Sequence, residues 1–511
     1  MRLLFSFYFC VKLFTTFQDQ STSDAPEIKD GILKQFVENL ELNNGNILRI
    51  IRMRSYSGAE ALPFSSDHVA WRETASDSYC NYDSSEELSL RWTNISTANA
   101  VQFWRIAPAG FGIFFDVRSG SQLVIIATPE CTDDEGDKHF FTRWGHFLQD
   151  FDGLDPELFS ENTLEAIRLE PGNRLLVVTL ICDKLSLKLF LHSVLRPNTP
   201  FVVISLENTV ITGGFYLSSC TMYETLMGRI HSFILPSLLT EGRNPPFSIF
   251  VRRMVHYMHN AYVVNDSSDR GHLLAFSSMD DARDLLSLVT LAIFLNVLDE
   301  RTYKLSLETY QDDPIALQRS YDIFDLNAIP VIERYHLSYT RGLSLDLLEW
   351  VFENYVFSSV ELEEEDVDAF GTIFVPFIVY IGRQIAKYKR TTEEHGRTTS
   401  STYKQVNFQI QSALFSLESA RDVWLEEKAA EEEKNHNRDD EGDEADVWDL
   451  DSNLSGYTIA RRDIPAERKP CENFLEEGKT SADKRFFRGL TFQFKLDDQG
   501  EKFISKELYI P

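Results

Sequence analysis

The stretch WRIAPAGFGIFFDVRSGSQLV, residues 104–124, decides the predicted fold. Four short apolar runs lie in this stretch and after it: 113–117, 123–127, 166–169 and 201–205. Gly, Pro, Ser and Asn residues stand between these runs, as in the Glu-Pro-Gly-Asn sequence at 170–173. Short strands separated by such turn residues are typical of antiparallel barrels and sandwiches rather than of βαβ units. We therefore predict a β-barrel or a β-sandwich over residues 101–235.

The composition excludes some classes of function. The chain has 511 residues and a net charge of -29, so direct binding of DNA or RNA, which depends on Lys and Arg, is not expected. Basic proteins such as histones are partners that this charge permits. The six cysteines contain no Cys-x-x-Cys pair, which excludes a disulfide framework and a zinc ribbon and favours an intracellular protein.

The termini and apolar stretches bear on localisation. Residues 1–25 form an apolar leader that Lys12 interrupts and that lacks a signal-cleavage site, so we expect a protein of the nucleus or cytoplasm rather than a secreted one. No membrane span is predicted, because the most apolar later stretch, 285–298, is shorter than the about 20 residues that a bilayer requires. It is predicted as a buried helix that starts with a capping box, from Ser278 to Asp281.

The remaining boundaries follow from composition and periodicity. Apolar residues at helical spacing predict a mainly helical region after the barrel, and the acidic composition near residue 440 predicts disorder. The predicted parts are a leader (1–25), a mixed region (26–100), the barrel (101–235), a mainly helical region (236–425), an acidic disordered linker (426–460) and a C-terminal tail (461–511).

Four further motifs carry a resemblance to a known family. They are LEPGNRL at 169–175, RPNTPFVV at 196–203, LENTV at 206–210 and GGFY at 213–216. Together with 104–124, and in this order, they resemble the JmjC domain, a cupin-type double-stranded β-helix, and within it the expanded JmjC-like proteins of basidiomycete fungi. The resemblance covers about 130 residues, a quarter of the chain. The resemblance implies that residues 101–235 form a barrel of this type, in a protein of the α+β class.

The resemblance implies Fe(II)/2-oxoglutarate chemistry, in which two His and one carboxylate hold the metal. The three ligand positions of the family pattern are occupied here by Arg105, Ala107 and Phe201. Arginine offers no lone pair and repels a cation, and the other two side chains have no donor atom. The positions that serve the cosubstrate are Ile113 and Gln122 in place of Thr and Lys. We therefore predict no catalytic residue, no metal and no cofactor.

Other residues do not form a replacement site. Candidate ligands outside the pattern are His68, His139, His146, Asp150, Asp152, His192 and His231, none of which makes a His-x-Asp/Glu pair on a predicted strand. The sequence also lacks a Gly-x-Ser-x-Gly elbow and a phosphate-binding Gly-x-x-x-x-Gly-Lys loop. An apolar insertion at 177–194 separates two of the family motifs, and we hypothesise that it is a retained intron, which the mature transcript would test.

Three functions remain open at this point. The first is a catalytically inactive pseudo-oxygenase that acts by binding another protein. The second is an active Fe(II)/2-oxoglutarate-dependent protein hydroxylase or histone lysine demethylase with atypical ligands. The third is a decayed gene copy without a selected function, which the insertion would also fit.

Overall fold

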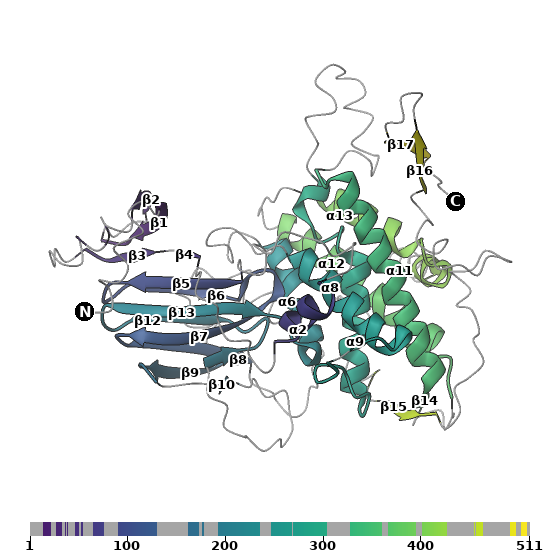
Figure 1. The fold of residues 1–511 in the computed structure, drawn as a ribbon, viewed down its shortest axis with the longest axis horizontal. Helices are drawn as coiled ribbons and strands as arrows, with labels where there is room; N and C mark the ends of the chain where they lie inside the picture. The colour runs from purple at the N-terminus through teal and green to yellow at the C-terminus, as the bar shows by residue number, and fades with distance from the viewer. Residues whose placement is uncertain are drawn as a thin grey trace, which may run out of the picture. The chain divides into compact units, whose positions relative to one another are not determined.

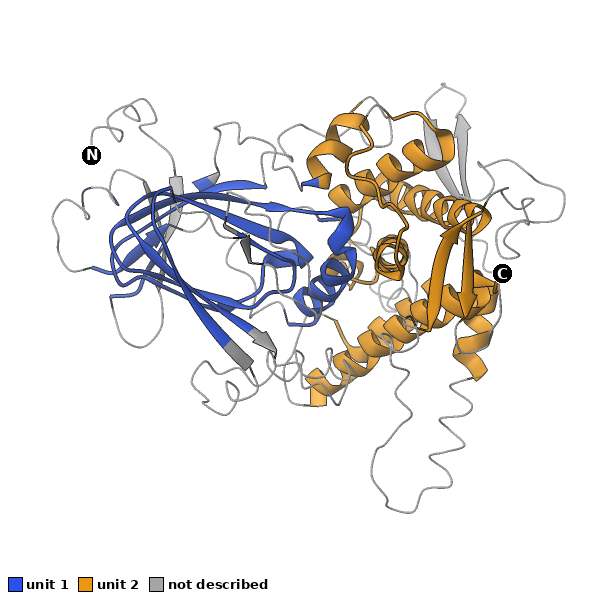
Figure 2. Ribbon diagram, turned by 90° about the horizontal axis from the view of Figure 1, so that it is seen from below, with its two compact units in different colours: residues 1–65, 82–132, 146–247 blue, residues 66–81, 133–145, 248–511 orange. Residues whose placement is uncertain are grey.

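The computed structural model describes the following residues: 14–21, 27–32, 36, 38, 46–50, 53–54, 65–75, 90–129, 162–172, 176–177, 193–235, 247–267, 269–303, 328–359, 366–394, 401–426, 454, 456–462, 491–496 and 502–507. The chain forms two compact units (Figure 2). Unit 1 comprises Met1–Ser65, Tyr82–Thr132 and His146–Phe247, and unit 2 comprises Ser66–Asn81, Asp133–Gly145 and Ser248–Pro511.

Unit 1 contains two sheets among its described residues (Figure 1). A nine-stranded sheet has the order β10-β11-β7-β13-β5-β3-β1-β2, with β4 also paired to β5, and a four-stranded sheet has the order β6-β12-β8-β9. The strands are β1 (Phe14–Asp19), β2 (Glu27–Ile32), β3 (Leu48–Ile50), β4 (Met53–Arg54), β5 (Arg91–Ser96), β6 (Val101–Arg105), β7 (Gly112–Ser119), β8 (Gln122–Pro129), β9 (Asn162–Leu169), β10 (Leu176–Val177), β11 (Ser193–Leu195), β12 (Phe201–Ser205) and β13 (Thr209–Tyr216). Apart from the parallel pair β10–β11, the described strand pairs are antiparallel.

The four apolar runs of the sequence form strands, which confirms that part of the prediction: they lie in β7, β8, β9 and β12. The predicted class of mixed helix and antiparallel sheet is confirmed as well. Strand β5 precedes residue 101, where the predicted barrel begins, and it pairs with β13 along six residues. Of the 177–194 insertion, residues 178–192 lie outside the described residues, and so do the predicted leader up to residue 13 and most of the acidic linker.

Helix α6 (Met222–Ile234) packs closely on the turn that follows β6. This turn, η3 (Pro108–Gly110), ends at Gly110, whose φ of 82° belongs to the left-handed region that favours glycine. A Cβ atom on Gly110 would lie 2.3 Å from the carbonyl oxygen of Thr225 on α6. Gly228, one turn further along α6, faces the Gly110 Cα atom in the same contact. The absence of two side chains thus allows the helix to approach the turn.

Unit 2 is mainly helical in its described residues (Figure 1). Its elements are α2 (Ser66–Glu73), α8 (Phe247–His259), η5 (Asn260–Val264), α9 (Met279–Phe294), η6 (Glu300–Tyr303), α11 (Val331–Asn354), η9 (Phe370–Phe374), α12 (Val375–Glu394), α13 (Tyr403–Leu414) and the strands β14 (Tyr355–Ser359), β15 (Tyr457–Arg461), β16 (Thr491–Leu496) and β17 (Lys502–Glu507). Among the described residues, no helix is both long enough and apolar enough to cross a membrane.

Helix α9 confirms the predicted buried helix but not its predicted capping box. Ser278 is the N-cap residue, yet its side chain makes no capping hydrogen bond. The Asp281 carboxylate instead accepts a hydrogen bond of 2.8 Å from the backbone N–H of Ser277, one residue further out. The predicted capping box at Ser278 is therefore wrong, because the Asp281 carboxylate accepts its hydrogen bond from a different backbone N–H.

Helix α2 lies in the segment Ser66–Asn81 of unit 2, although the segments before and after it in the sequence, which end at Ser65 and resume at Tyr82, belong to unit 1. Arg253 of α8 holds it in place. The guanidinium carbon of Arg253 lies 3.8 Å from the centroid of the Trp71 ring, and its Nη1 donates a hydrogen bond of 2.8 Å to the Thr74 hydroxyl. A cation over an indole face is the strongest arrangement of this type, so Arg253 anchors the helix.

Candidate functional site

The candidate site lies on the inner face of the four-stranded sheet, where β6 pairs with β12. Arg105 is opposite Phe201, whereas Val203 is opposite Gln102, so three residue steps on β6 match two on β12. This irregularity is a β-bulge, which adds one residue to a strand and turns later side chains to the other face. Because of it, Gln102 and Arg105 are both buried, although they are three positions apart and would face opposite sides of a regular strand.

Arg105 and Phe201, two of the predicted ligand positions, are in direct contact. The guanidinium carbon of Arg105 lies 5.3 Å from the centroid of the Phe201 ring, and the two residues are only 7% and 1% exposed. Arg105 also donates a hydrogen bond from Nη2 to Oε1 of Gln102. A buried guanidinium over a ring face is stabilised by the ring quadrupole, so the two side chains stabilise each other in the interior.

A row of aromatic rings continues from Phe201 into unit 1. The centroid of the Phe201 ring lies 5.8 Å from that of Phe115. The centroid distance is 6.0 Å from Phe115 to Trp92 and 6.1 Å from Trp92 to Phe215. Phe111 extends the row with a centroid distance of 6.0 Å from Phe215. Tilted and edge-to-face rings at these distances are well packed. The interior beside the predicted ligand positions is thus filled by aromatic side chains.

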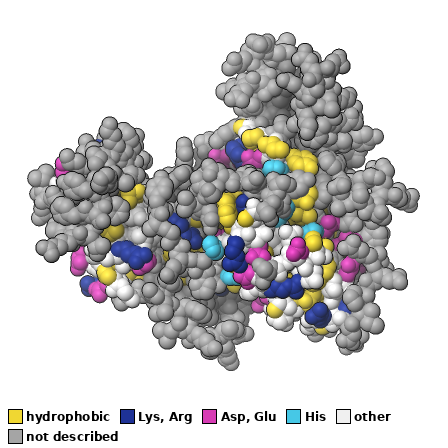
Figure 3. All heavy atoms as spheres, in the orientation of Figure 1, with side chains coloured by type: hydrophobic (Ala, Val, Ile, Leu, Met, Phe, Trp, Pro, Cys, Tyr) yellow, Lys and Arg dark blue, Asp and Glu magenta, His cyan; other side chains and the backbone are white. Residues whose placement is uncertain are grey.

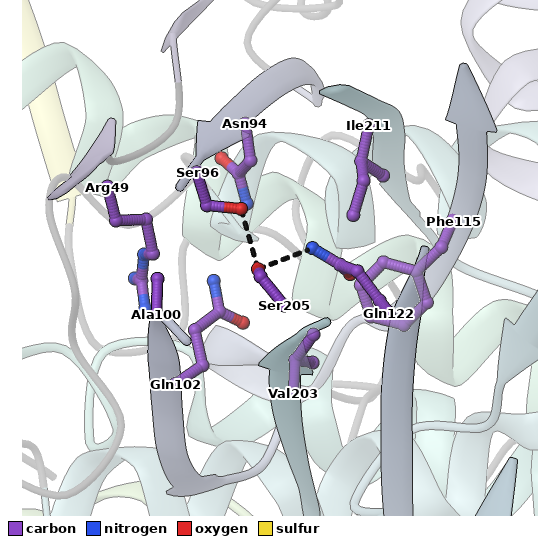
Figure 4. A pocket seen from close by; sticks show the side chains of 10 residues that line it. All are labelled: Arg49, Asn94, Ser96, Ala100, Gln102, Phe115, Gln122, Val203, Ser205 and Ile211. Atoms are coloured by element: carbon purple, nitrogen blue, oxygen red, sulfur yellow. Dashed lines mark hydrogen bonds between the residues drawn. The ribbon is translucent and has the colours of Figure 1, made fainter. Parts of the chain in front are cut away.

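Gln122 lies at the other end of the same face, in a polar chamber (Figure 4). Its Nε2 donates a hydrogen bond of 3.2 Å to the Ser205 hydroxyl, and Ser96 and Ser205 share a hydrogen bond of 2.7 Å. The chamber leaves about 10 Å³ to the centres of water-sized molecules, room for a single water. It is lined by Arg49, Asn94, Ser96, Ala100, Gln102, Phe115, Gln122, Val203, Ser205 and Ile211.

Gln122 does not contact the Arg105–Phe201 pair directly. On β8 it pairs with Ser205, while Phe201 pairs with Ile126, four residues away, which corresponds to a distance of about 13 Å along a strand. Gln102 connects the two places, because it lines the chamber and accepts the hydrogen bond from Arg105. The site is therefore an elongated interior rather than a single point.

The other two predicted positions are also buried. Ile113 is 3% exposed on β7, where it pairs with Leu195 and with Phe215. Ala107 is 2% exposed and lies after β6, as the residue before η3. Both add apolar atoms to the interior of unit 1.

Of the histidines considered as substitute ligands, His68 and His231 fall among the described residues. His231 is fully buried within α6, and burial lowers its pKa to about 3, which keeps its imidazole neutral. His68 is on α2, in unit 2. His139, His146, Asp150, Asp152 and His192 lie outside the described residues. Among the residues that are described, no group of three His, Cys, Asp or Glu side chains could hold a metal ion.

The donor set of this interior does not fit a divalent metal. The predicted ligand positions hold a guanidinium, a methyl group and a phenyl ring, and the chamber beside them is lined by the buried Arg49. None of the residues that line the chamber is a carboxylate. Divalent ions are held mainly by carboxylate or imidazole donors, and a guanidinium group repels them. The arrangement can bind a water or another small polar group, and it can stabilise the fold.

No pattern in the sequence assigns Arg49 or Gln102 to this interior. Arg49 lies on β3, more than fifty residues before the motif stretch, and only sheet pairing brings it to the chamber. Gln102 depends on the bulge. For Asn94 and Ser96 the sequence offered a weak indication. They are two positions apart on β5, as are residues that face the same side of a strand.

No protein-family model matches the sequence, and no curated protein matches it. The chemistry of the interior is therefore inferred from its residues and their contacts.

Proposed function

We propose that unit 1 is a JmjC-like double-stranded β-helix that has lost its iron chemistry, and that the protein acts by binding another protein. The strand order supports the fold part of this proposal. Of the eight strands β5–β9 and β11–β13, four lie in each sheet, and the chain passes repeatedly from one sheet to the other. An eight-stranded, two-sheet jelly roll is the architecture of the cupins.

The observation that carries the functional part is the contact between Arg105 and Phe201. In the family pattern these two positions are metal ligands on facing strands, and here they face each other across β6 and β12. A cation stacked on a ring takes the place that two imidazoles would take. The row of aromatic rings behind Phe201 stabilises this contact. The ligand positions have therefore been replaced together with their surroundings, which form a packed core, rather than by the loss of one ligand.

The charge of the chain supports a basic protein as the partner. The net charge is -29. On the face drawn in Figure 3, acidic and basic described side chains lie interspersed, without one large basic field that would suit a nucleic acid. Histones are one class of partner with the complementary charge, and a role in the nucleus or cytoplasm would accommodate them.

Metal and cosubstrate binding test the proposal. The purified full chain is incubated with Fe(II), ascorbate and 2-oxoglutarate, and iron content and succinate are measured. We expect neither stoichiometric iron nor succinate above the blank. The triple variant Arg105→His, Ala107→Asp, Phe201→His serves as the matched control, because it restores the three donors and should bind Mn²⁺ if the register is correct.

Stoichiometric iron and succinate from the unaltered chain would contradict the proposal and favour the hydroxylase or demethylase with atypical ligands. Binding of purified core histones is measured in parallel at low and high salt, with an acidic protein as the control. A salt-sensitive complex supports the binding role. A chain that cannot be obtained in folded form would favour the decayed gene copy.

A further inference from the structure

The polar chamber of unit 1 is built from side chains of both sheets. Arg49 and Ser96 lie on β3 and β5 of the nine-stranded sheet. Gln102 and Ser205 lie on β6 and β12 of the four-stranded sheet. Each of these four residues is at most 6% exposed. The chamber has room for one water-sized molecule, and a molecule at its centre would connect the two sheets.

The two serines leave one proton for that molecule. Ser96 and Ser205 share a hydrogen bond of 2.7 Å, and Ser205 also accepts one of 3.2 Å from Nε2 of Gln122. Each hydroxyl carries a single proton. The shared hydrogen bond uses one of the two protons, whichever serine donates it. The other proton can therefore be donated to a molecule in the chamber.

The amide of Gln102 is oriented by Arg105. Its Oε1 accepts the hydrogen bond from Nη2 of Arg105, so its Nε2 remains as a donor. A hydrogen bond from a charged donor also polarises the amide, which strengthens its own N–H groups as donors. In Figure 4 the Gln102 nitrogen lies between Arg49 and Ser205. Gln102 thus presents donors to the chamber.

The remaining polar groups make the chamber electropositive. Arg49 lines it, and no carboxylate does. Arg49 also interacts with other parts of the chain, but a guanidinium has five N–H donors, which one partner does not exhaust. Figure 4 shows the Asn94 nitrogen turned toward the serines, and the oxygen of the Gln122 amide turned away from Ser205. The space is thus surrounded mainly by donors and lies beside a positive charge.

We propose that this chamber binds one monovalent anion, chloride. Chloride carries no proton and accepts hydrogen bonds from every side, which matches donors from Arg49, Asn94, Gln102 and the serine pair. In a buried chamber a guanidinium attracts an anion much more strongly than it does in water. Chloride is only slightly larger than a water molecule, whereas polyatomic anions need more room. The inference rests on the chamber alone and not on the proposed loss of iron chemistry.

Binding and stability in two salts test the site. The ³⁵Cl NMR line width of chloride is measured with the full chain, which should broaden it, and bromide should reverse the broadening by competition. Urea unfolding is then compared in sodium chloride and sodium gluconate of equal ionic strength, so that screening is the same. Raising chloride from about its Kd to about 100 times its Kd should lower the unfolding equilibrium constant about fifty-fold. Gluconate should have no such effect.

Variants locate the ion. Arg49→Met removes the guanidinium, and Gln102→Met replaces the amide by a side chain of similar shape without donors, in case Arg49→Met does not fold. Both should lose the broadening and the chloride-dependent stability. Arg118→Met is the matched control and should keep both, because Arg118 is 60% exposed and pairs with Asp116 outside the chamber.

Two results would overturn the proposal. Equal stability in the two salts without broadening of the chloride line means that the chamber holds only water. A chloride effect that persists in the folded chamber variants means that the ion binds elsewhere.

Discussion

The contact between Arg105 and Phe201 predicts a measurable coupling energy. Arg105→Met and Phe201→Leu are made singly and together, so that the double-mutant cycle isolates the pairwise interaction. The ring of Phe201 is 5.3 Å from the guanidinium carbon, and both residues are buried. A desolvated cation–π contact is worth about 2 kcal/mol, so we expect a favourable coupling of about 1–2 kcal/mol.

The single variants have different expected costs. Phe201→Leu also loses the contact with Phe115 at a centroid distance of 5.8 Å, and we expect it to cost about 2–4 kcal/mol, from the cation–π and aromatic contacts together. Arg105→Met leaves the Gln102 oxygen without its donor, which costs about 1–3 kcal/mol, but it also removes a buried charge, so its net effect is smaller.

The assay is urea unfolding, with hydrogen exchange of β6 and β12 to locate the loss. The pair Arg91 and Phe114 is the matched control, because the distance is similar, 5.2 Å, but Arg91 is only partly buried. Its coupling should be about 0.5–1 kcal/mol, as at exposed sites. A coupling between Arg105 and Phe201 below about 0.5 kcal/mol, the scatter of independent sites, would refute the reasoning.

Three further predictions concern packing, pH and the anchoring of α2. Gly110→Ala should destabilise unit 1 by about 2 kcal/mol or more in urea unfolding, because backbone strain adds to a clash with α6, whereas Gly172→Ala, with a φ of 87° and no atom within 4 Å, should show only the strain of about 1 kcal/mol. Burial lowers the pKa of His231 to about 3, so as the pH decreases the unfolded chain is protonated at this histidine before the folded chain is. The unfolding free energy should therefore fall between about pH 6.5 and about pH 3, by up to about 1.4 kcal/mol per pH unit. His231→Phe should flatten that slope, and an unchanged slope would exclude His231 as its source. Arg253→Leu should release α2, seen as faster hydrogen exchange around Trp71, since it removes the cation at 3.8 Å from the ring; unchanged exchange would show that other contacts hold the helix.

The strands could be predicted from the sequence because their boundaries are local. Turn residues separate the apolar segments that form β7, β8, β9 and β12. A turn depends only on its own few residues, so it can be recognised locally. The capping box at Ser278 failed although it is also local, because several backbone donors compete for one carboxylate. The replacement of the predicted metal ligands can be read from the sequence by motif alignment alone, and it stays a prediction.

The interior contacts could not be predicted, because they depend on sheet register. The bulge in β6 decides that Gln102 faces the same side as Arg105, and nothing in the pattern of β6 indicates an extra residue. Arg49 reaches the chamber only through the pairing of β3 with β5. The rings of Tyr262, Phe276, Trp350 and Tyr355 in unit 2 pack together from separate segments, so no periodicity could reveal their contacts.

The position of α2 has a consequence for synthesis on the ribosome. Thr74, at its end, is 179 residues before Arg253, its hydrogen-bond partner, an interval of about 9–36 s at about 5–20 residues per second. During that time the nascent chain carries the Trp71 ring without the guanidinium that later covers it, while the strands from β5 to β13 are being made. Val69, Ala70 and Trp71, which are buried in the folded protein, then lack the helix that packs against them, and slower translation between α2 and α8 should lengthen that exposure.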